Sequence, residues 1–143
     1  MKKFQLLALV VLVILSACKK TKTVNALDYL LTSKPWKIAT VDNNPATNPK
    51  GTVLYAASPN CMLDDTFAFD NNGEILVRTG KNHCDPNEGE SFILYYYHDK
   101  TGNSITIDNK TYKIAELSDT QLKYYLVTPT ATGFQNEIHI YQH

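Results

Sequence analysis

The side chains best suited to chemistry in this chain are three cysteines and four histidines. Potential metal ligands flank Cys61 and Cys84 in the sequence, namely Asp64, Asp65, His83 and Asp85. A structural zinc site usually shows closely spaced pairs such as C-x2-C, whereas these two cysteines stand far apart. We therefore expect no metal centre. A disulfide between Cys61 and Cys84 is the favoured interpretation, with a metal site or reactive thiols as the alternatives.

Motifs typical of enzymes are missing from the sequence. It contains no G-x-S-x-G elbow, no P-loop, no H-E-x-x-H pair and no C-x-x-C redox motif. Nucleophilic catalysis needs a base near the nucleophile and a third group that orients it, and the histidine spacing gives no such set. We expect His98, which ends a strand, to be solvated or bonded within a turn. We predict a protein that is not an enzyme and has no cofactor.

The start of the chain has the pattern of an export signal. Lys2 and Lys3 precede ten consecutive apolar residues, 6–15. This run is too short to cross a bilayer core of about 30 Å as a helix. Leu15-Ser16-Ala17-Cys18 follows and resembles the lipobox of bacterial lipoproteins, in which the cysteine is acylated. An ordinary secretory signal or an uncleaved anchor is the alternative.

The lipobox resemblance implies three segments: a signal peptide at residues 1–17, a lipidated Cys18 with a tether at residues 18–24, and a folded domain after them. The acyl chains, of the palmitate type, would hold Cys18 in a lipid bilayer, at about 0.8 kcal/mol per buried methylene. Lipoprotein sorting signals for surface export are often acidic, and the tether is basic. We therefore expect a cell-envelope protein anchored to the outer membrane and facing the periplasm.

Export also favours the disulfide, because an even pair of cysteines in an oxidising compartment usually pairs. The strands expected at residues 65–70 and 74–79 would form a hairpin that turns near Gly73. Cys61 and Cys84 would then meet at the open end of that hairpin. On the chain-entropy model, closing this loop would contribute roughly 3 kcal/mol to stability.

The composition is that of one globular domain. Basic and acidic residues are equal in number, 14 each, so the chain lacks the basic excess that binding to nucleic acid requires. Hydrophobic residues make up 43%, which provides enough apolar surface to fold. The length of 143 residues suits a single domain, which we place at residues 25–143 and expect to be monomeric.

The domain is expected to begin with a short helix and to continue as strands. In the segment 25–31, Leu27, Leu30 and Leu31 have helical spacing, and Asn25 suits the N-cap. From Trp36 onward, apolar residues alternate with period two, and Gly, Asn and Asp separate the runs. The expected strands cover residues 36–41, 52–55, 65–70, 74–79, 90–98, 104–108, 111–117, 121–128 and 133–141.

Short strands joined by tight turns should pair as antiparallel neighbours with one face inward. The alternation places Leu122 and Tyr124 on that inward face, and likewise Ile138 and Ile140. Closing the sheet removes its exposed edges. The fold class we predict is therefore all-β: an antiparallel up-and-down barrel of about eight strands with a short N-terminal helix. A two-sheet sandwich is the alternative.

One strand departs from this alternation. The stretch Phe92-Ile93-Leu94-Tyr95-Tyr96-Tyr97-His98 has apolar or aromatic residues on both faces. One face would fill the barrel, and the other would present Tyr95 and Tyr97, with Tyr125, to solvent or to a partner. The alternative is that the N-terminal helix or the loop 42–50 covers these tyrosines.

The mature chain as a whole resembles the lipocalin-like domains of small lipoproteins from Gram-negative bacteria. The matching features are Pro35-Trp36 at the first strand, the pattern C-x-x-D-D-x-F-x-F-x-x-x-G from Cys61 to Gly73, and a C-terminal meander. In lipocalins a tryptophan plugs the closed end of the barrel, and a basic residue from a late strand packs over it. Trp36 matches that tryptophan, and Lys34 stands at the family's glycine position. The resemblance implies a lipocalin-like barrel.

Two functions are compatible with these features. The first is binding of a small apolar ligand inside a hollow barrel, lined by its aromatic side chains. The second is a protein-interaction module, such as an accessory subunit or an inhibitor of a cell-envelope enzyme, with a filled barrel and an exposed aromatic face. The candidate residues for contact with a ligand or a partner are Trp36, Phe67, Phe69, Tyr95, Tyr97, Tyr112 and Tyr124.

Overall fold

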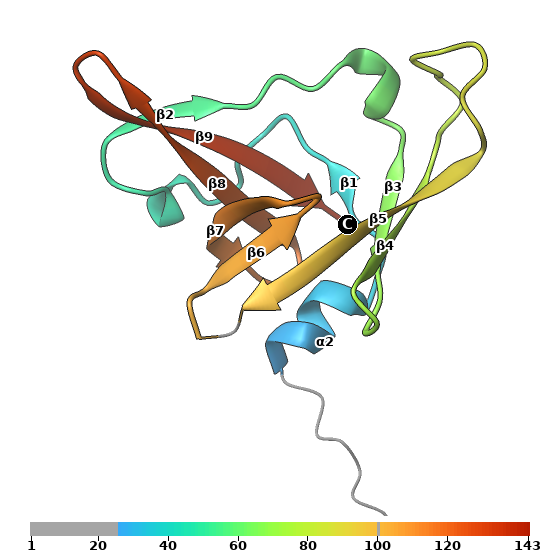
Figure 1. Cartoon of the computed structure of the whole chain (residues 1–143), viewed down its shortest axis with the longest axis horizontal. Coiled ribbons are helices and arrows are strands. Elements are labelled where there is room, and N and C mark those ends of the chain that lie inside the picture. The colour runs from blue at the N-terminus through green and yellow to red at the C-terminus, as the bar shows by residue number, and fades with distance from the viewer. Residues whose placement is uncertain (1–25, 100) are drawn as a thin grey trace, which may run out of the picture.

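The computed structural model describes residues 26–99 and 101–143; the predicted signal peptide, Cys18, the tether and Asn25 lie outside them. Helix α2 (Ala26–Thr32) comes first, and the strands follow it (Figure 1). These are β1 (Lys37–Ile38), β2 (Thr52–Tyr55), β3 (Thr66–Phe69), β4 (Glu74–Arg78), β5 (Ser91–Asp99), β6 (Ser104–Ile107), β7 (Lys110–Leu117), β8 (Gln121–Thr130) and β9 (Gly133–Gln142). Two short 3-10 helices, η1 (Pro45–Thr47) and η2 (Asn60–Met62), lie on either side of β2. Among the described residues, no helix is both long and apolar enough to cross a membrane.

The strands form a nearly closed barrel. Their order is β1-β9-β8-β7-β6-β5-β4-β3, and each pair of neighbours along this path is antiparallel. From β3 to β9, each strand therefore pairs with the next one in the sequence, as the tight turns predicted. The eight-stranded antiparallel barrel with a short helix is confirmed for the described residues. From β3 onward, the strand bounds fall within two residues of those expected.

A single β-bridge closes the circle between the first and last strands of this path. Trp36 donates its backbone N–H to the Phe67 carbonyl at 2.9 Å and accepts the Phe67 N–H at 2.8 Å. The neighbouring backbone of β1 pairs with β9, with Ile38 opposite Tyr141. One short segment thus joins both ends of the sheet.

The Trp36 side chain plugs the same end of the barrel from inside. It is fully buried, and its indole N–H donates to the Leu31 carbonyl of α2 at 2.9 Å. The His143 ring stacks on the indole with ring centroids 3.8 Å apart, and His143 Nδ1 lies 2.9 Å from the Pro35 carbonyl. His143 therefore occupies the place over the indole that the resemblance assigned to a basic residue of a late strand.

Helix α2 covers this end of the barrel (Figure 1). Leu31 is buried in the core cluster, and His98 Nδ1 of β5 lies 3.2 Å from Asp28 Oδ1. The His98 side chain is only 5% exposed, so the prediction that it is solvated or held within a turn is wrong. It lies instead at the contact between β5 and the helix, because odd- and even-numbered residues of β5 face opposite sides.

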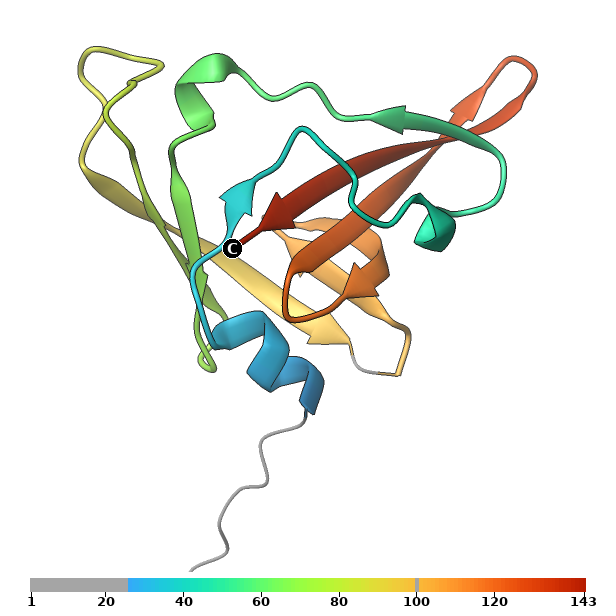
Figure 2. The same cartoon turned by 180° about the vertical axis from the view of Figure 1, so that it is seen from behind.

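The segment between β1 and β3 differs from the expected hairpins. Strand β1 ends at Ile38, and the chain then leaves the barrel and passes over the outside of β8 and β9 (Figure 2). We call residues 39–51 the strap. The strap brings the chain back in the direction of β9, so β2 pairs with β9 in parallel rather than with a sequence neighbour. This corrects two predictions, the strand over 36–41 and the antiparallel pairing of β2.

The face of β9 that lines the barrel is also opposite to the one expected. Tyr124 pairs with His139, and directly paired residues share a face, so His139 points inward with Tyr124. Ile138 and Ile140 point outward, yet they are buried at 1% and 6% exposure. The strap passes over the outer face of β8 and β9, and β2 extends the sheet beside β9, so this side of the barrel is covered.

The two cysteines form the predicted disulfide. Cys61 and Cys84 have Cα atoms 5.2 Å apart and join η2 to the loop before β5. The link lies at the open end of the β3–β4 hairpin, as the hairpin geometry predicted. Beside it, the buried Asp65 carboxylate accepts the Gly80 backbone N–H at 2.8 Å and so fixes the same loop.

The closure at Trp36 generates a stability prediction. We expect Trp36→Ala to lower the free energy of unfolding by about 3–5 kcal/mol, because it empties a fully buried site in the core. Phe134→Ala is the matched control, since Phe134 is 67% exposed and should cost less than about 0.5 kcal/mol. Urea denaturation of the full chain measures both. Equal losses for the two variants would contradict the role given to Trp36.

Candidate functional site

Five of the seven expected contact residues lie inside the barrel. Trp36, Phe67, Phe69 and Tyr124 are buried in one continuous cluster, and Tyr112 packs against it. The Tyr112 and Tyr124 rings meet at a tilt with centroids 4.9 Å apart, and Tyr124 also stacks on Tyr141. Aromatic rings that pack on one another fill space that a ligand would otherwise occupy.

A small polar group lies within this aromatic interior. The Tyr124 hydroxyl donates to the Tyr141 hydroxyl at 3.0 Å, and the His139 ring stacks on Tyr124 with centroids 5.2 Å apart. Burial raises the pKa of Tyr124 well above its ordinary value, so this hydroxyl stays protonated. His139 was not among the predicted contact residues, because the isoleucines on either side of it were expected on the inward face of β9.

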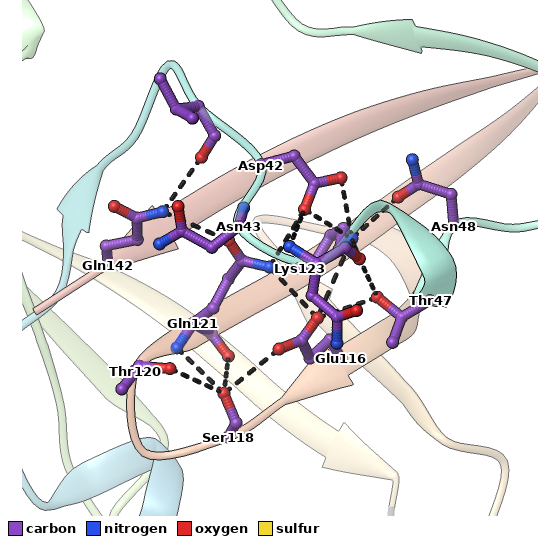
Figure 3. Close-up of polar contacts among 12 residues, drawn as sticks. Asp42, Asn43, Thr47, Asn48, Glu116, Ser118, Thr120, Gln121, Lys123 and Gln142 are labelled. Carbon is purple, nitrogen blue, oxygen red and sulfur yellow. Dashed lines mark hydrogen bonds and ion pairs between the residues drawn. The ribbon is translucent and has the colours of Figure 1, made fainter.

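A fully buried lysine lies outside the barrel, under the strap (Figure 3). Lys123 Nζ is 2.9 Å from both carboxylate oxygens of Asp42, 2.8 Å from the Asn44 carbonyl and 2.8 Å from Asn48 Oδ1. Glu116 Oε2 lies 3.9 Å away and adds a second negative charge. The ammonium therefore directs its donors at the strap and has none left for a substrate.

Gln121 extends this network toward β9. Its side chain donates to Asp42 at 3.2 Å and to Glu116 at 3.1 Å, and its carbonyl oxygen accepts the Asn43 backbone N–H at 3.0 Å. Burial alone would raise the pKa of Asp42, but hydrogen bonds from Lys123, the backbone of Asn44 and Tyr55 outweigh it and lower this pKa to about 2. The carboxylate stays ionised, and the network fastens the strap to β8.

No sequence signal singled out this lysine. Lys123 alternates with Leu122 and Tyr124, which is the pattern of an exposed position on a half-buried strand. The long polar segment 42–50 was expected as a loop, and only its return across the barrel buries the outer face of β8. The charges of Asp42 and Glu116 that compensate Lys123 come from two distant parts of the chain.

The outer face of β5 carries the two expected contact residues that are exposed, Tyr95 and Tyr97. Ile93, Tyr95 and Tyr97 point outward on one strand and are 50%, 65% and 67% exposed. Helix α2 contacts β3, β7 and the inward-facing His98 of β5, and the strap lies over β8 and β9 (Figures 1 and 2). The exposures show that neither covers these three residues. The prediction that Tyr95 and Tyr97 face solvent or a partner therefore agrees with their exposure, whereas Tyr125 is half-buried.

Polar groups border this aromatic face. A shallow hollow of about 300 Å³ beside the two tyrosines is lined by Tyr95, Tyr96, Tyr97, Thr106, Asp108 and Asn109. Tyr97 lies directly opposite Thr106 of β6, and Tyr95 lies directly opposite Glu74 of β4. The face thus combines ring surfaces with hydroxyl, amide and carboxylate groups.

A second hollow lies where β1 and β2 both meet the edge of β9. It encloses about 240 Å³ and is lined by Ile38, Ala39, Thr40, Tyr55, Ala56, Ala57, Ser58 and residues 138–141. Its volume falls below the range of about 300–1,000 Å³ that is usual for ligand sites. It can hold only a small molecule.

Comparisons of the chain with protein-family models, with curated proteins and with solved structures found no match. The function is therefore inferred from the geometry described above.

The buried lysine yields a second stability prediction. We expect Lys123→Met to lower the free energy of unfolding by about 3–5 kcal/mol, because it leaves the Asp42 charge buried without its partner. Lys113→Met is the matched control, since Lys113 is exposed on the neighbouring strand. Adding Asp42→Leu to Lys123→Met should restore part of the loss. Chemical denaturation measures the free energy of unfolding of all three variants. If Lys123→Met is no less stable than Lys113→Met, the strap does not depend on this ion pair.

His139 predicts how stability depends on pH. Burial and the charge of Lys110 lower its pKa below the ordinary 6.5, against an opposing effect of Glu137. Below pH 6.5 the unfolded chain therefore binds a proton that the folded chain does not, and stability falls. We expect His139→Phe to flatten the pH dependence of the melting temperature from pH 7 down to about pH 4, below which the unfolded chain binds a proton at Asp42 that the folded chain, with a pKa of about 2 there, does not. An unchanged slope in this variant would exclude His139 as its source.

Proposed function

We propose that the chain is a lipid-anchored, lipocalin-like protein of the bacterial cell envelope that binds an envelope protein without catalysing a reaction. The contact surface is the outer face of β5. The observation that carries this proposal is the run of three outward-facing apolar side chains, Ile93, Tyr95 and Tyr97, each at least half exposed. Exposed tyrosines combine large contact area with few rotatable bonds, which suits recognition.

The filled interior supports contact on the outside. Trp36, Phe67 and Phe69 occupy the closed half of the barrel, and Tyr112 and Tyr124 continue the same cluster. A carrier needs empty volume there, whereas an interaction module needs a rigid wall. The hydrogen-bonded ladder of β4, β5 and β6 supplies such a wall beneath the tyrosines.

The proposed anchor agrees with this orientation. Seven residues lie between Cys18 and Ala26, the first residue of α2, and the eight residue-to-residue steps span at most about 29 Å when extended. An acylated Cys18 would keep the helix-covered end of the barrel close to the outer membrane. The β5 face lies on the side wall rather than on that end, so it would stay open to a partner in the periplasm (Figure 1).

The hollow beside β1 and β2 supports a second candidate, binding of a small apolar ligand. Ile38, Ala39 and Ala56 give it apolar walls, and the inward-facing His139 and Tyr141 supply polar groups. Its volume of about 240 Å³ limits that ligand to a small molecule. A long acyl chain such as palmitate would require rearrangement of the core.

Site-specific photocrosslinking tests the contact surface. A photoreactive residue at position 95 or 97 of the full chain, expressed in an envelope-bearing bacterium, should give one defined protein adduct. The same residue at position 132 is the matched control, because Thr132 is exposed in the turn between β8 and β9, away from β5. Tyr95→Ser with Ile93→Ser should reduce recovery of the identified partner at least tenfold. Equal crosslinking from positions 95 and 132 would overturn the proposal.

A further inference from the structure

Tyr95 lies between two carboxylates on the outer wall. On one side its direct cross-strand neighbour is Glu74 of β4. On the other side Asp108 donates its backbone N–H to the Tyr95 carbonyl at 3.2 Å, and the Asp108 and Tyr95 side chains line the same hollow. Side chains directly opposite in a sheet have Cβ atoms about 4.5–5.5 Å apart. Glu74 therefore lies within contact range of one edge of the tyrosine.

These two carboxylates are uncompensated. Within the described part of the chain, neither the Glu74 nor the Asp108 carboxylate has a hydrogen-bond or ion-pair partner. The nearby turn carboxylates differ, because Asp70 accepts the Asn72 backbone N–H at 2.8 Å and Asp99 accepts that of Thr101 at 2.9 Å. Glu74 and Asp108 thus leave two negative charges free beside an exposed ring.

The backbone of both residues is held in place. Asp108 and Asn109 form the two-residue turn between β6 and β7 with φ values of 46° and 65°, as a type I′ hairpin turn requires. The backbone of Glu74 is fixed by Asp70, which accepts the Glu74 N–H at 2.9 Å and donates its own N–H to the Glu74 carbonyl at 2.9 Å. Binding of a ligand therefore orders two side chains but little backbone.

An aromatic ring between two free carboxylates favours a cation. The face of a tyrosine attracts a cationic group, and carboxylates bind its N–H donors. A guanidinium suits this arrangement better than an ammonium. It is planar and stacks on the ring, and its fork of five donors can reach carboxylates on both sides. Tyr97 and Ile93 extend the same face and would contact the apolar part of such a partner.

We infer that the protein partner presents an arginine on a basic segment, and that its guanidinium stacks on Tyr95 between Glu74 and Asp108. This inference rests on the proposed function, which makes the outer face of β5 the contact surface. It adds the charge and the side chain by which the partner is recognised. The neutral composition of the chain as a whole does not oppose it, because the free charge is local to this face.

A titration with synthetic peptides tests the inference. Three peptides share one flexible Gly/Ser/Leu sequence and carry at the central position an arginine, a lysine or the neutral isostere citrulline. Each is added to the isotopically labelled full chain in detergent micelles, and backbone amide shifts are recorded. We expect the arginine peptide to shift residues 74, 95 and 108, to bind at least tenfold more tightly than the citrulline peptide, and to bind more tightly than the lysine peptide.

Variants that neutralise carboxylates test which of them bind the arginine peptide. Glu74→Gln with Asp108→Asn should weaken the arginine peptide at least tenfold, and asparagine tolerates the positive φ of position 108. Asp119→Asn with Glu90→Gln removes the same charge from two exposed positions away from Tyr95 and should leave binding unchanged. An amide spectrum that matches the wild type outside the β5 face shows that each variant is folded.

Other outcomes overturn the inference. Equal binding of arginine and citrulline peptides would do so, as would shifts at Tyr95 produced by a chitin-type oligosaccharide but by none of the peptides. Failure of this inference can be distinguished from failure of the proposed function. If position 95 crosslinks a partner whose affinity is unchanged by Glu74→Gln with Asp108→Asn, only the arginine contact fails. If position 95 gives no defined protein adduct, the contact surface itself fails.

Discussion

The architecture depends on the backbone bridge between Trp36 and Phe67. Two hydrogen bonds at this point join the first and last strands of an eight-stranded path, and the same residue places its indole against α2 and His143. Because the barrel closes around Trp36, the aromatic side chains of β3, β7 and β8 converge behind it and pack on one another. Closure of the sheet and filling of the interior thus have one origin.

The strap then decides which surfaces remain available. It covers the outer face of β8 and β9, where Lys123 meets Asp42 and where Ile138 and Ile140 are buried. A buried ion pair of this kind contributes little net stability, but it gives the strap one defined position, since any other would leave a charge unpaired. The wall opposite the strap carries no such cover, and there β5 exposes its tyrosines.

Local patterns in the sequence were enough to predict much of this fold. Alternation and turn residues located the strands from β3 to β9, and the even pair of cysteines that remains when Cys18 is set aside for the predicted lipidation pointed to the Cys61–Cys84 disulfide. The parallel pairing of β2, the inward turn of His139 and the burial of Lys123 could not be predicted in this way. All three depend on the path of the strap, a polar segment without periodicity whose position is set by contacts with residues about 80 positions away. The tyrosines of β5 could be identified because a run of consecutive apolar residues, which places apolar side chains on both faces of a strand, is visible in the sequence. The carboxylates that lie beside them could not, because the register between neighbouring strands sets which residues are opposite one another.

The central claim is that this barrel binds through its outer wall and that its interior is occupied by its own side chains. Native mass spectrometry of the full chain, purified in mild detergent, tests it most directly. We expect the mass of the chain, alone or with a protein partner, and no small molecule extractable into organic solvent. A reproducible small-molecule adduct that is lost when Ala57→Leu fills the hollow beside β1 and β2 would contradict it and assign the function to the hollow.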